Sequence, residues 1–315
     1  MEKQKYLEFI DYYNDVVMSL FQNSGCERDA HDRIFNLLKA DIDPSKEIGD
    51  ELIKSLLNPP NYEIAIDSYN LLMKILKNKK LNDFVLEKTL INPFNILNII
   101  NKIIENIKDE TLIHGLILFL KLLFQFIKTK EIKLPTKLKT QMIPKLFKLK
   151  RVLKKKKKGF SSEILEFIAI ITNLSTHSSN IYEIIKNFDN LDDEMMFIFQ
   201  KLENESKFNF SICFLAHRSN IYKTKYPRIT DVSKDLPKFI CQIHFKLSES
   251  NLFHFYILLW FIVFCLKSNK LENSPKLKKR LIKIEKESSK TVSNSLFQSF
   301  FIEKNLELNS LIKDF

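Results

Sequence analysis

Apolar residues recur at helical spacing in several stretches of this chain. The clearest set is Ile164, Phe167, Ile168, Ile171 and Leu174. Their i, i+3, i+4, i+7 spacing places all five side chains on one face of a helix. This pattern predicts an amphipathic helix that packs its apolar face against a neighbour.

Two longer stretches are apolar nearly all round. Residues 112–127 are interrupted by Lys121 and Gln125, and residues 252–266 carry no charge. A helix of the first kind must be covered on more than one side, so it is expected inside a multilayer stack. The second run has 15 residues, including His254, whereas a membrane-spanning helix needs roughly 20. We interpret it as a buried core helix and expect no membrane span.

Glycine and proline are distributed as in an all-helical protein. Glycine occurs only four times, which disfavours sheets joined by tight turns and glycine-rich phosphate-binding loops. Most of the nine prolines lie between apolar runs, as Pro44, Pro93 and Pro275 do. There the missing backbone donor costs least, at a first helical turn. The expected fold class is therefore all-α.

A six-residue motif occurs twice in the chain. Residues 177–182 have the sequence HSSNIY, and residues 217–222, 40 positions later, have the sequence HRSNIY. Looser versions, in which a polar turn leads into an aliphatic residue, occur around Leu81, Ile132 and Leu271. The aliphatic restarts lie 40 to 51 residues apart. This spacing is irregular, but it brackets the roughly 40 to 47 residues of armadillo and HEAT units.

The segment around the first copy of the motif resembles an armadillo repeat. Residues 170–175, followed by Asn180 and Ile181, look like the end of a long armadillo helix, its asparagine-leucine-serine turn and the next helix. The resemblance is clearest over residues 161–222, although residues 213–215 (CFL) replace the asparagine, leucine and serine in the second copy. It implies an armadillo/HEAT-like α-solenoid that binds partners along a groove, without implying an activity.

The net charge of +12 is concentrated in one segment. Residues 128–158 carry 14 Lys or Arg side chains against the single acid Glu131. Pro144 is expected to start a second helix within this segment, which we interpret as a flexible or protruding basic insertion. Helical spacing is kept there by Leu138, Met142, Leu146, Leu149 and Leu153.

Charge and periodicity together predict three segments. Residues 1–127 would form amino-terminal helical repeats with an acidic cap, residues 128–159 a basic helix and a lysine-rich loop, and residues 160–315 carboxy-terminal helical repeats. The acids of the cap are Asp11, Asp15, Asp29, Asp32, Asp41, Asp43, Glu47, Asp50 and Glu51. They could also orient a partner through long-range steering.

The basic segment supplies the candidate partner contacts. It is open to four interpretations: contact with an RNA or DNA backbone, a nuclear-import signal, attraction to an acidic protein or anionic membrane surface, or a solvated loop. A second basic run at residues 276–290 could extend a positive surface. The candidate contacts are Lys145, Lys148, Lys150, Arg151, Lys154, Lys155, Lys156, Lys157 and Lys158.

Two cysteines and two histidines make a weak candidate zinc site. Cys213 and His217 are spaced i, i+4, and Cys241 and His244 follow with C-x2-H spacing. Together they provide the donor atoms of a Cys2His2 site. Because His217 matches His177 in the repeated motif, where no cysteine accompanies it, we interpret the histidine as a capping or packing residue and expect no metal.

Catalytic motifs are absent from the sequence. It contains no Walker A segment, no G-x-G-x-x-G, no H-E-x-x-H and no G-x-S-x-G. The acids at 192–194 are interpreted as residues of a helix amino terminus, and the aromatic residues between 253 and 260 as core.

These observations predict a non-catalytic scaffold, adaptor or assembly factor. Its partner would be another protein or a multiprotein complex, held along a helical-repeat groove, and no cofactor is expected. The alternative is an RNA- or DNA-associated factor, in ribosome biogenesis or chromatin, that uses residues 128–158. The four dispersed cysteines and the lack of a signal peptide favour an intracellular protein of the cytoplasm, the nucleus or both.

Overall fold

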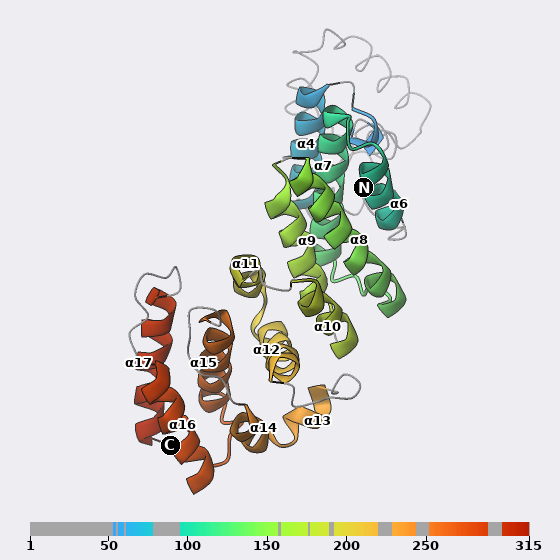
Figure 1. Ribbon diagram of the computed structural model, residues 1–315. Coiled ribbons are helices and arrows are strands. Elements are labelled where there is room, and N and C mark those ends of the chain that lie inside the picture. The colour runs from blue at the N-terminus through green and yellow to red at the C-terminus, as the bar shows by residue number, and fades with distance from the viewer. Residues whose placement is uncertain are drawn as a thin grey trace, which may run out of the picture. The chain divides into compact units, whose positions relative to one another are not determined.

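The computed structural model describes most of the chain from residue 53 onward. The described ranges are 53–54, 56–59, 61–77, 95–156, 159–175, 177–188, 192–219, 229–243, 252–288 and 298–314. Within them 84% of residues are helical and no strand occurs, which confirms the all-α prediction (Figure 1). The predicted acidic cap at residues 11–51 lies outside these ranges.

The chain divides into two compact units. The first contains the described residues up to Leu134 together with Lys145–Phe167, and the second contains Pro135–Pro144 and the residues from Ile168 onward. Helices α8 (Thr136–Lys155) and α9 (Ser161–Asn173) contribute residues to both units. The three-segment division based on charge stays a prediction.

Helix α7 (Glu110–Thr129) is the core element of the first unit. Both α4 (Tyr62–Lys77) and α6 (Asn95–Glu105) contact it, and the ring of its Phe124 stacks on Phe167 with centroids 4.8 Å apart. Among the described helices, α7 has the length and apolar composition to cross a membrane, but about two thirds of that stretch is buried inside the protein. The prediction of an inner helix is confirmed. Its buried residues are Ile113, Gly115, Leu116, Ile117, Phe119, Leu120, Leu122, Leu123, Phe124, Phe126 and Ile127.

A close backbone approach explains the glycine in α7. A Cβ atom at Gly115 would lie 2.5 Å from the carbonyl oxygen of Leu56 and 2.8 Å from Cγ of Pro59. The same segment is held from α6, where the Lys102 ammonium donates a 3.0 Å hydrogen bond to the carbonyl oxygen of Leu57. The lack of a side chain at residue 115 therefore lets residues 56–59 pack directly on α7.

The second unit is a series of helices that contact one another in turn. Helix α10 contacts α12, α12 contacts α15, and α15 contacts α17, while α16 packs on both α14 and α17 (Figure 1). The bounds are α10 Ser178–Asn187, α11 Asp192–Lys201, α12 Asn204–Arg218, α13 Ile229–Ser233, α14 Leu236–Gln242, α15 Leu252–Lys267, α16 Pro275–Ser288 and α17 Gln298–Asp314. As predicted, the acids at 192–194 begin a helix, and Pro275 is the first residue of another.

Aromatic side chains fill the contact between α11, α12 and α15. The ring of Phe199 meets Trp260 edge-on at 5.2 Å and Phe253 at 6.4 Å, and Phe214 meets Phe253 at 5.2 Å. Phe253, Phe255 and Tyr256 are all buried. Edge-to-face pairs of this kind add about 0.5–1.5 kcal/mol each to the burial of their apolar area. The interpretation of these aromatic residues as core is confirmed for Phe253, Phe255 and Tyr256, whereas Trp260 is partly exposed.

Two of the polar turns noted in the sequence close helices in the same way. After α7, Glu131 has φ 51°, and the amide of Ile132 bonds the carbonyl of Ile127 at 2.9 Å. After α15, Asn269 has φ 50°, and the amide of Lys270 bonds the carbonyl of Cys265 at 2.9 Å. Both turns are Schellman caps with a left-handed residue just past the helix. The resemblance between these turns thus reflects a shared way of ending a helix.

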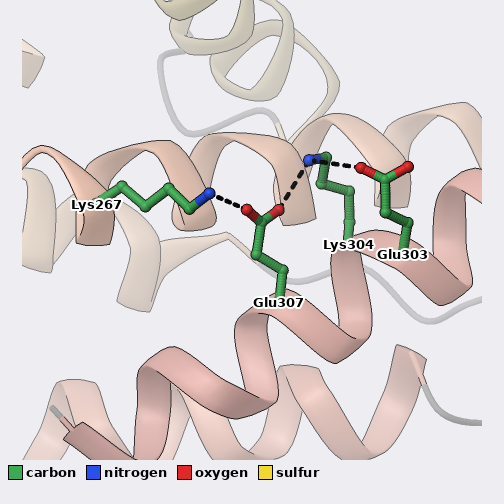
Figure 2. Close-up of polar contacts among 4 residues, drawn as sticks. All are labelled: Lys267, Glu303, Lys304 and Glu307. Carbon is green, nitrogen blue, oxygen red and sulfur yellow. Dashed lines mark hydrogen bonds and ion pairs between the residues drawn. The ribbon is translucent and has the colours of Figure 1, made fainter.

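A chain of ion pairs joins α17 to α15. The carboxylate of Glu307 pairs with Lys267 on α15 and, at 2.8 Å, with Lys304, which also lies 3.3 Å from Glu303 (Figure 2). Burial alone would raise the pKa of Glu307, but the hydrogen bonds and positive charges of Lys267 and Lys304 hold it below its ordinary value. Lys267 is more than half exposed, so solvent screens part of this attraction.

Two expectations about the basic segment are wrong. Pro144 lies inside the single continuous helix α8 and does not start a second one. Residues 136–155 are not a protruding insertion, because Leu138, Met142 and Leu153 are all buried in the core. Burial of the apolar face, at roughly 1.5–3 kcal/mol for each large side chain, outweighs the loss of one backbone hydrogen bond at a proline.

Substitution of Gly115 tests the close approach of residues 56–59. We expect Gly115→Ala to lower the free energy of unfolding by about 1–3 kcal/mol, because the methyl group forces a backbone carbonyl to move. Gly159→Ala is the control, since no atom lies within 4 Å of its Cβ position; it should leave stability unchanged or raise it by up to about 1 kcal/mol. Equal effects of the two substitutions in urea denaturation would contradict this packing.

Substitution of Glu307 tests the ion pairs between α15 and α17. Glu307→Gln should lower the free energy of unfolding by about 0.5–1 kcal/mol at pH 7, whereas Glu303→Gln, at a carboxylate that is 68% exposed, should change it by less. Because the pKa of Glu307 is lowered by folding, its contribution is present at neutral pH and is lost as the pH falls through that lowered value. If Glu307→Gln still lowered the free energy of unfolding at pH 2, the loss would not be electrostatic.

Candidate binding surface on helix α8

Helix α8 has one apolar face and one basic face. Leu146, Phe147, Leu149 and Leu153 are at most 2% exposed. The helix itself contains no acidic residue. The exposed cations between residues 145 and 156, which we name the α8 basic face, are Lys148, Arg151, Lys154, Lys155 and Lys156.

Two cations of this segment are partly engaged in local contacts. Lys145 is half-buried, and its ammonium donates a 2.5 Å hydrogen bond to Oδ1 of Asn101 on α6. Arg151 is exposed, but its Nε donates to the carbonyl oxygen of Phe147 at 3.3 Å. Lys145 thus ties α8 to α6, while the Arg151 contact lies within the helix.

Lys150 differs from the other candidate contacts because it lies on the buried side of α8. Its side chain is 4% exposed. Burial, together with the positive charges of Lys154 and Arg151, lowers the pKa of Lys150 from 10.5 to about 8. The structure therefore separates Lys150 from the α8 basic face.

Part of the basic face also serves the helix itself. Lys154 and Lys155 lie in the last turn of α8, where cations interact favourably with the helix dipole by roughly 0.3–1 kcal/mol each. Such an effect does not account for Lys148 and Arg151, which lie further inside the helix. Lys157 and Lys158 are outside the described residues.

The four candidate zinc ligands have different environments. Cys213 is fully buried in the core, and burial raises the pKa of its thiol, which disfavours the thiolate that a metal requires. His217 is exposed at the end of α12, Cys241 is half-buried on α14, and His244 lies outside the described residues. Among the residues whose positions the structure gives, no three His, Cys, Asp or Glu side chains are grouped to hold a metal.

Two histidines pack against aromatic rings. The His114 ring lies 4.0 Å from Tyr62 and 5.4 Å from Phe160, and its pKa is lowered by burial despite the nearby charge of Glu163. His254 lies 5.1 Å from the ring of Phe214, and burial lowers its pKa to about 4, helped by a nearby arginine. Burial therefore favours the neutral form of both rings, and both contribute to packing.

The repeated histidines of the sequence motif occupy different structural positions. His177 is the N-cap residue of α10 but makes no side-chain capping bond. His217 lies in the last turn of α12, and its ring is 6.1 Å from that of Tyr182. His217, interpreted as a capping or packing residue, thus packs against a neighbouring ring, whereas its counterpart His177 has the N-cap position without a side-chain cap bond. The second half of the second copy, residues 220–222, lies outside the described part of the chain.

The asparagine of the armadillo-like turn links three helices. The side chain of Asn173, at the end of α9, accepts a 3.0 Å hydrogen bond from the amide of Glu203 and donates to the carbonyl of Lys201 at 3.3 Å. Ser206 on α12 donates to the backbone carbonyl of Asn173 at 3.3 Å. This residue therefore joins α9 to the junction of α11 and α12.

Sequence reasoning missed a buried lysine at the other end of α8. Lys139 is 4% exposed, and its ammonium donates a 2.6 Å hydrogen bond to the carbonyl oxygen of Leu174. Burial lowers its pKa. The sequence contains a signal for this burial, because Lys139 follows Leu138 within the apolar stripe of α8. The many lysines nearby suggested instead that the side chain of Lys139 is exposed.

Comparison of the chain with known proteins identifies no relative. No protein-family model, no curated protein and no solved structure matches it. The α8 basic face is therefore assigned from geometry and charge alone.

Substitution of Lys150 tests the separation of the two faces of α8. Lys150→Met should raise the free energy of unfolding at pH 7 by about 1–3 kcal/mol, because a buried charge is replaced by an apolar side chain of similar length. The pKa of Lys150 in the folded state, about 8, lies below the ordinary value of 10.5. Between these two pH values the unfolded chain therefore binds more protons than the folded protein. The wild-type protein thus gains stability as the pH rises through this range. The advantage of Lys150→Met should therefore shrink by pH 10.

The matched control is Lys148→Met on the exposed face of the same helix. It should change the free energy of unfolding by less than about 0.5 kcal/mol at both pH values. A destabilising effect of Lys150→Met at pH 7, or a gain that does not depend on pH, would contradict the assignment of Lys150 to the buried face.

Proposed function

We propose that this chain is a non-catalytic scaffold, adaptor or assembly factor that binds another protein or a multiprotein complex. In this proposal its helices form an armadillo/HEAT-like α-solenoid, and the α8 basic face is the principal contact for an acidic surface of the partner. The protein would work in the cytoplasm, the nucleus or both.

The observation that carries this proposal is the two-sided character of α8. Its apolar side chains lie in the core, so the helix cannot rotate or unfold without exposing them. Four exposed cations, Lys148, Arg151, Lys154 and Lys155, lie on this fixed helix, and Lys156 follows its last residue. A rigid helix presents charges to a partner at little entropic cost. Fixed charges of one sign favour an oppositely charged partner and speed its association.

The repeat character is supported by two further features. The contacts in the second unit run from α10 to α12, from α12 to α15 and from α15 to α17, as neighbouring helices do in a repeat protein. The Asn173 links to Lys201 and Glu203 lie in the turn that resembles an armadillo repeat. Stacked helices of this type expose long surfaces suited to protein partners.

The second candidate is an RNA- or DNA-associated factor. It is favoured by the composition of α8, in which lysine predominates and acids are absent. Phosphate backbones attract such a helix without requiring a particular sequence. A protein partner and a nucleic acid are separated by their response to nuclease.

The test is affinity purification of the full chain, with and without nuclease, beside a variant in which Lys148, Arg151, Lys154 and Lys155 are changed to glutamine. We expect a protein that remains bound after nuclease treatment and whose recovery falls at least tenfold in the variant. A tenfold change in Kd corresponds to about 1.4 kcal/mol. The recovered protein is then purified and its affinity for both forms is measured directly.

The control replaces four exposed lysines elsewhere with glutamine, which gives the same net charge. These residues are Lys108, Lys186, Lys234 and Lys313. Undiminished binding by the α8 variant, or an equal loss in the control, would overturn the assignment of the α8 basic face. Release of every partner by nuclease would favour the second candidate.

A further inference from the structure

Helix α16 presents a second basic surface, in the other compact unit. Its inner side is closed, because Leu277, Leu281 and Ile284 are at most 2% exposed and α14 and α17 pack against the helix. Arg280 donates a hydrogen bond to the carbonyl of Ile243 at the end of α14. The orientation of α16 in the second unit is thus fixed.

Four lysines form a continuous stripe on the outer side of α16. Lys276, Lys279, Lys283 and Lys286 are all exposed, and their spacing of three and four residues keeps them on one side of the helix. We name this set the α16 lysine face. At 1.5 Å per residue the stripe is about 15 Å long.

The acids of α16 lie away from the centre of this stripe. Glu285 and Glu287 are only partly exposed, and helical geometry places them at the two borders between the buried and the exposed sides. The α16 lysine face therefore has a net positive charge, although the helix as a whole contains both signs.

A membrane is a poor partner for this surface. Membrane-surface helices insert an apolar face into the lipid, but the apolar face of α16 is covered by α14 and α17. The exposed side offers a single large apolar residue, Ile282, at 37% exposure. The exposed side of α16 is otherwise mainly positively charged, so it suits a polyanion in water.

The length and chemistry of the stripe suit a phosphate backbone. Each strand of duplex DNA carries one phosphate per 3.4 Å of helix axis, so a stripe of about 15 Å matches the axial rise of four or five phosphates. Lysine ammonium groups on flexible stems act as point charges and need no fixed geometry from the anion. A phosphate chain meets these conditions along its whole length, whereas an acidic protein must place several carboxylates in one row.

We propose that the α16 lysine face binds the phosphate backbone of a nucleic acid without sequence preference. This site is separate from the α8 basic face and from the protein partner proposed above. The four lysines neutralise phosphates and release counterions, so binding weakens steeply as salt is added.

The experiment measures fluorescence anisotropy of the full chain with a labelled 30-nucleotide RNA of mixed sequence, from 50 to 200 mM KCl. Changing Lys276, Lys279, Lys283 and Lys286 to glutamine should weaken binding about tenfold or more at 50 mM. It should also lower the slope of log Kd against log salt by about 3, since each lost contact with a single strand removes roughly 0.7. Arginine at the same four positions should restore both quantities.

The control is again Lys108, Lys186, Lys234 and Lys313 changed to glutamine, which should alter the salt slope by less than 1. Circular dichroism and thermal unfolding confirm that each variant is folded. Equal losses in the α16 variant and the control, or wild-type protein that fails to bind RNA at 50 mM KCl, would overturn the proposal.

Two competing anions separate a nucleic acid from other partners. Poly-glutamate and vesicles containing phosphatidylserine are tested with the same variants at the same salt. If the α16 substitutions weaken binding to either of these and leave RNA binding unchanged, the face belongs to an acidic protein or a membrane. The α8 glutamine variant, run in parallel, shows whether RNA binding depends on the α16 lysine face alone, while the affinity purification described above tests the protein partner separately.

Discussion

Burial of one side of each amphipathic helix is the interaction on which this structure depends. In the first unit α7 is enclosed by α4 and α6, and in the second the aromatic residues of α15 meet those of α11 and α12. Each large apolar side chain buried in this way contributes roughly 1.5–3 kcal/mol. That energy exceeds what the exposed charges contribute, because solvent screens ion pairs at the surface.

Helix α8 shows the consequence most directly. The same helix buries Leu146, Leu149 and Leu153 and exposes Lys148, Lys154 and Lys155. Hydrophobic burial is strong enough to draw Lys150 into the protein and to lower its pKa. A surface composed in this way combines a fixed position with a high positive charge, which is the combination that scaffolds and nucleic-acid-binding proteins need.

The sequence predicts the helices well and their mutual contacts poorly. Three predicted features follow from periodicity, which depends only on nearby residues: the stripe that starts at Ile164, the enclosed helix at residues 112–127 and the core helix at residues 252–266. The predicted stripe reaches Leu174, but α9 ends at Asn173 and Leu174 lies in the turn that follows. Other features depend on partners 28 or more residues away or on the packing of whole helices. These are Pro144 within α8, the buried Lys139 and Lys150, and the links made by Asn173. The exposed cations of α8 could be predicted because charge is a local property, but the division into buried and exposed lysines could not.

The most direct test of the account is lysine footprinting of the full chain, in which an amine-reactive acetylating reagent is applied with and without the bound macromolecule. The account predicts that Lys148, Lys154 and Lys155 react readily in the free protein and are protected in the complex, while Lys108 and Lys186 react equally in both. Unchanged reactivity along α8 in a saturated complex would contradict the claim that this helix holds the core with one side and the partner with the other.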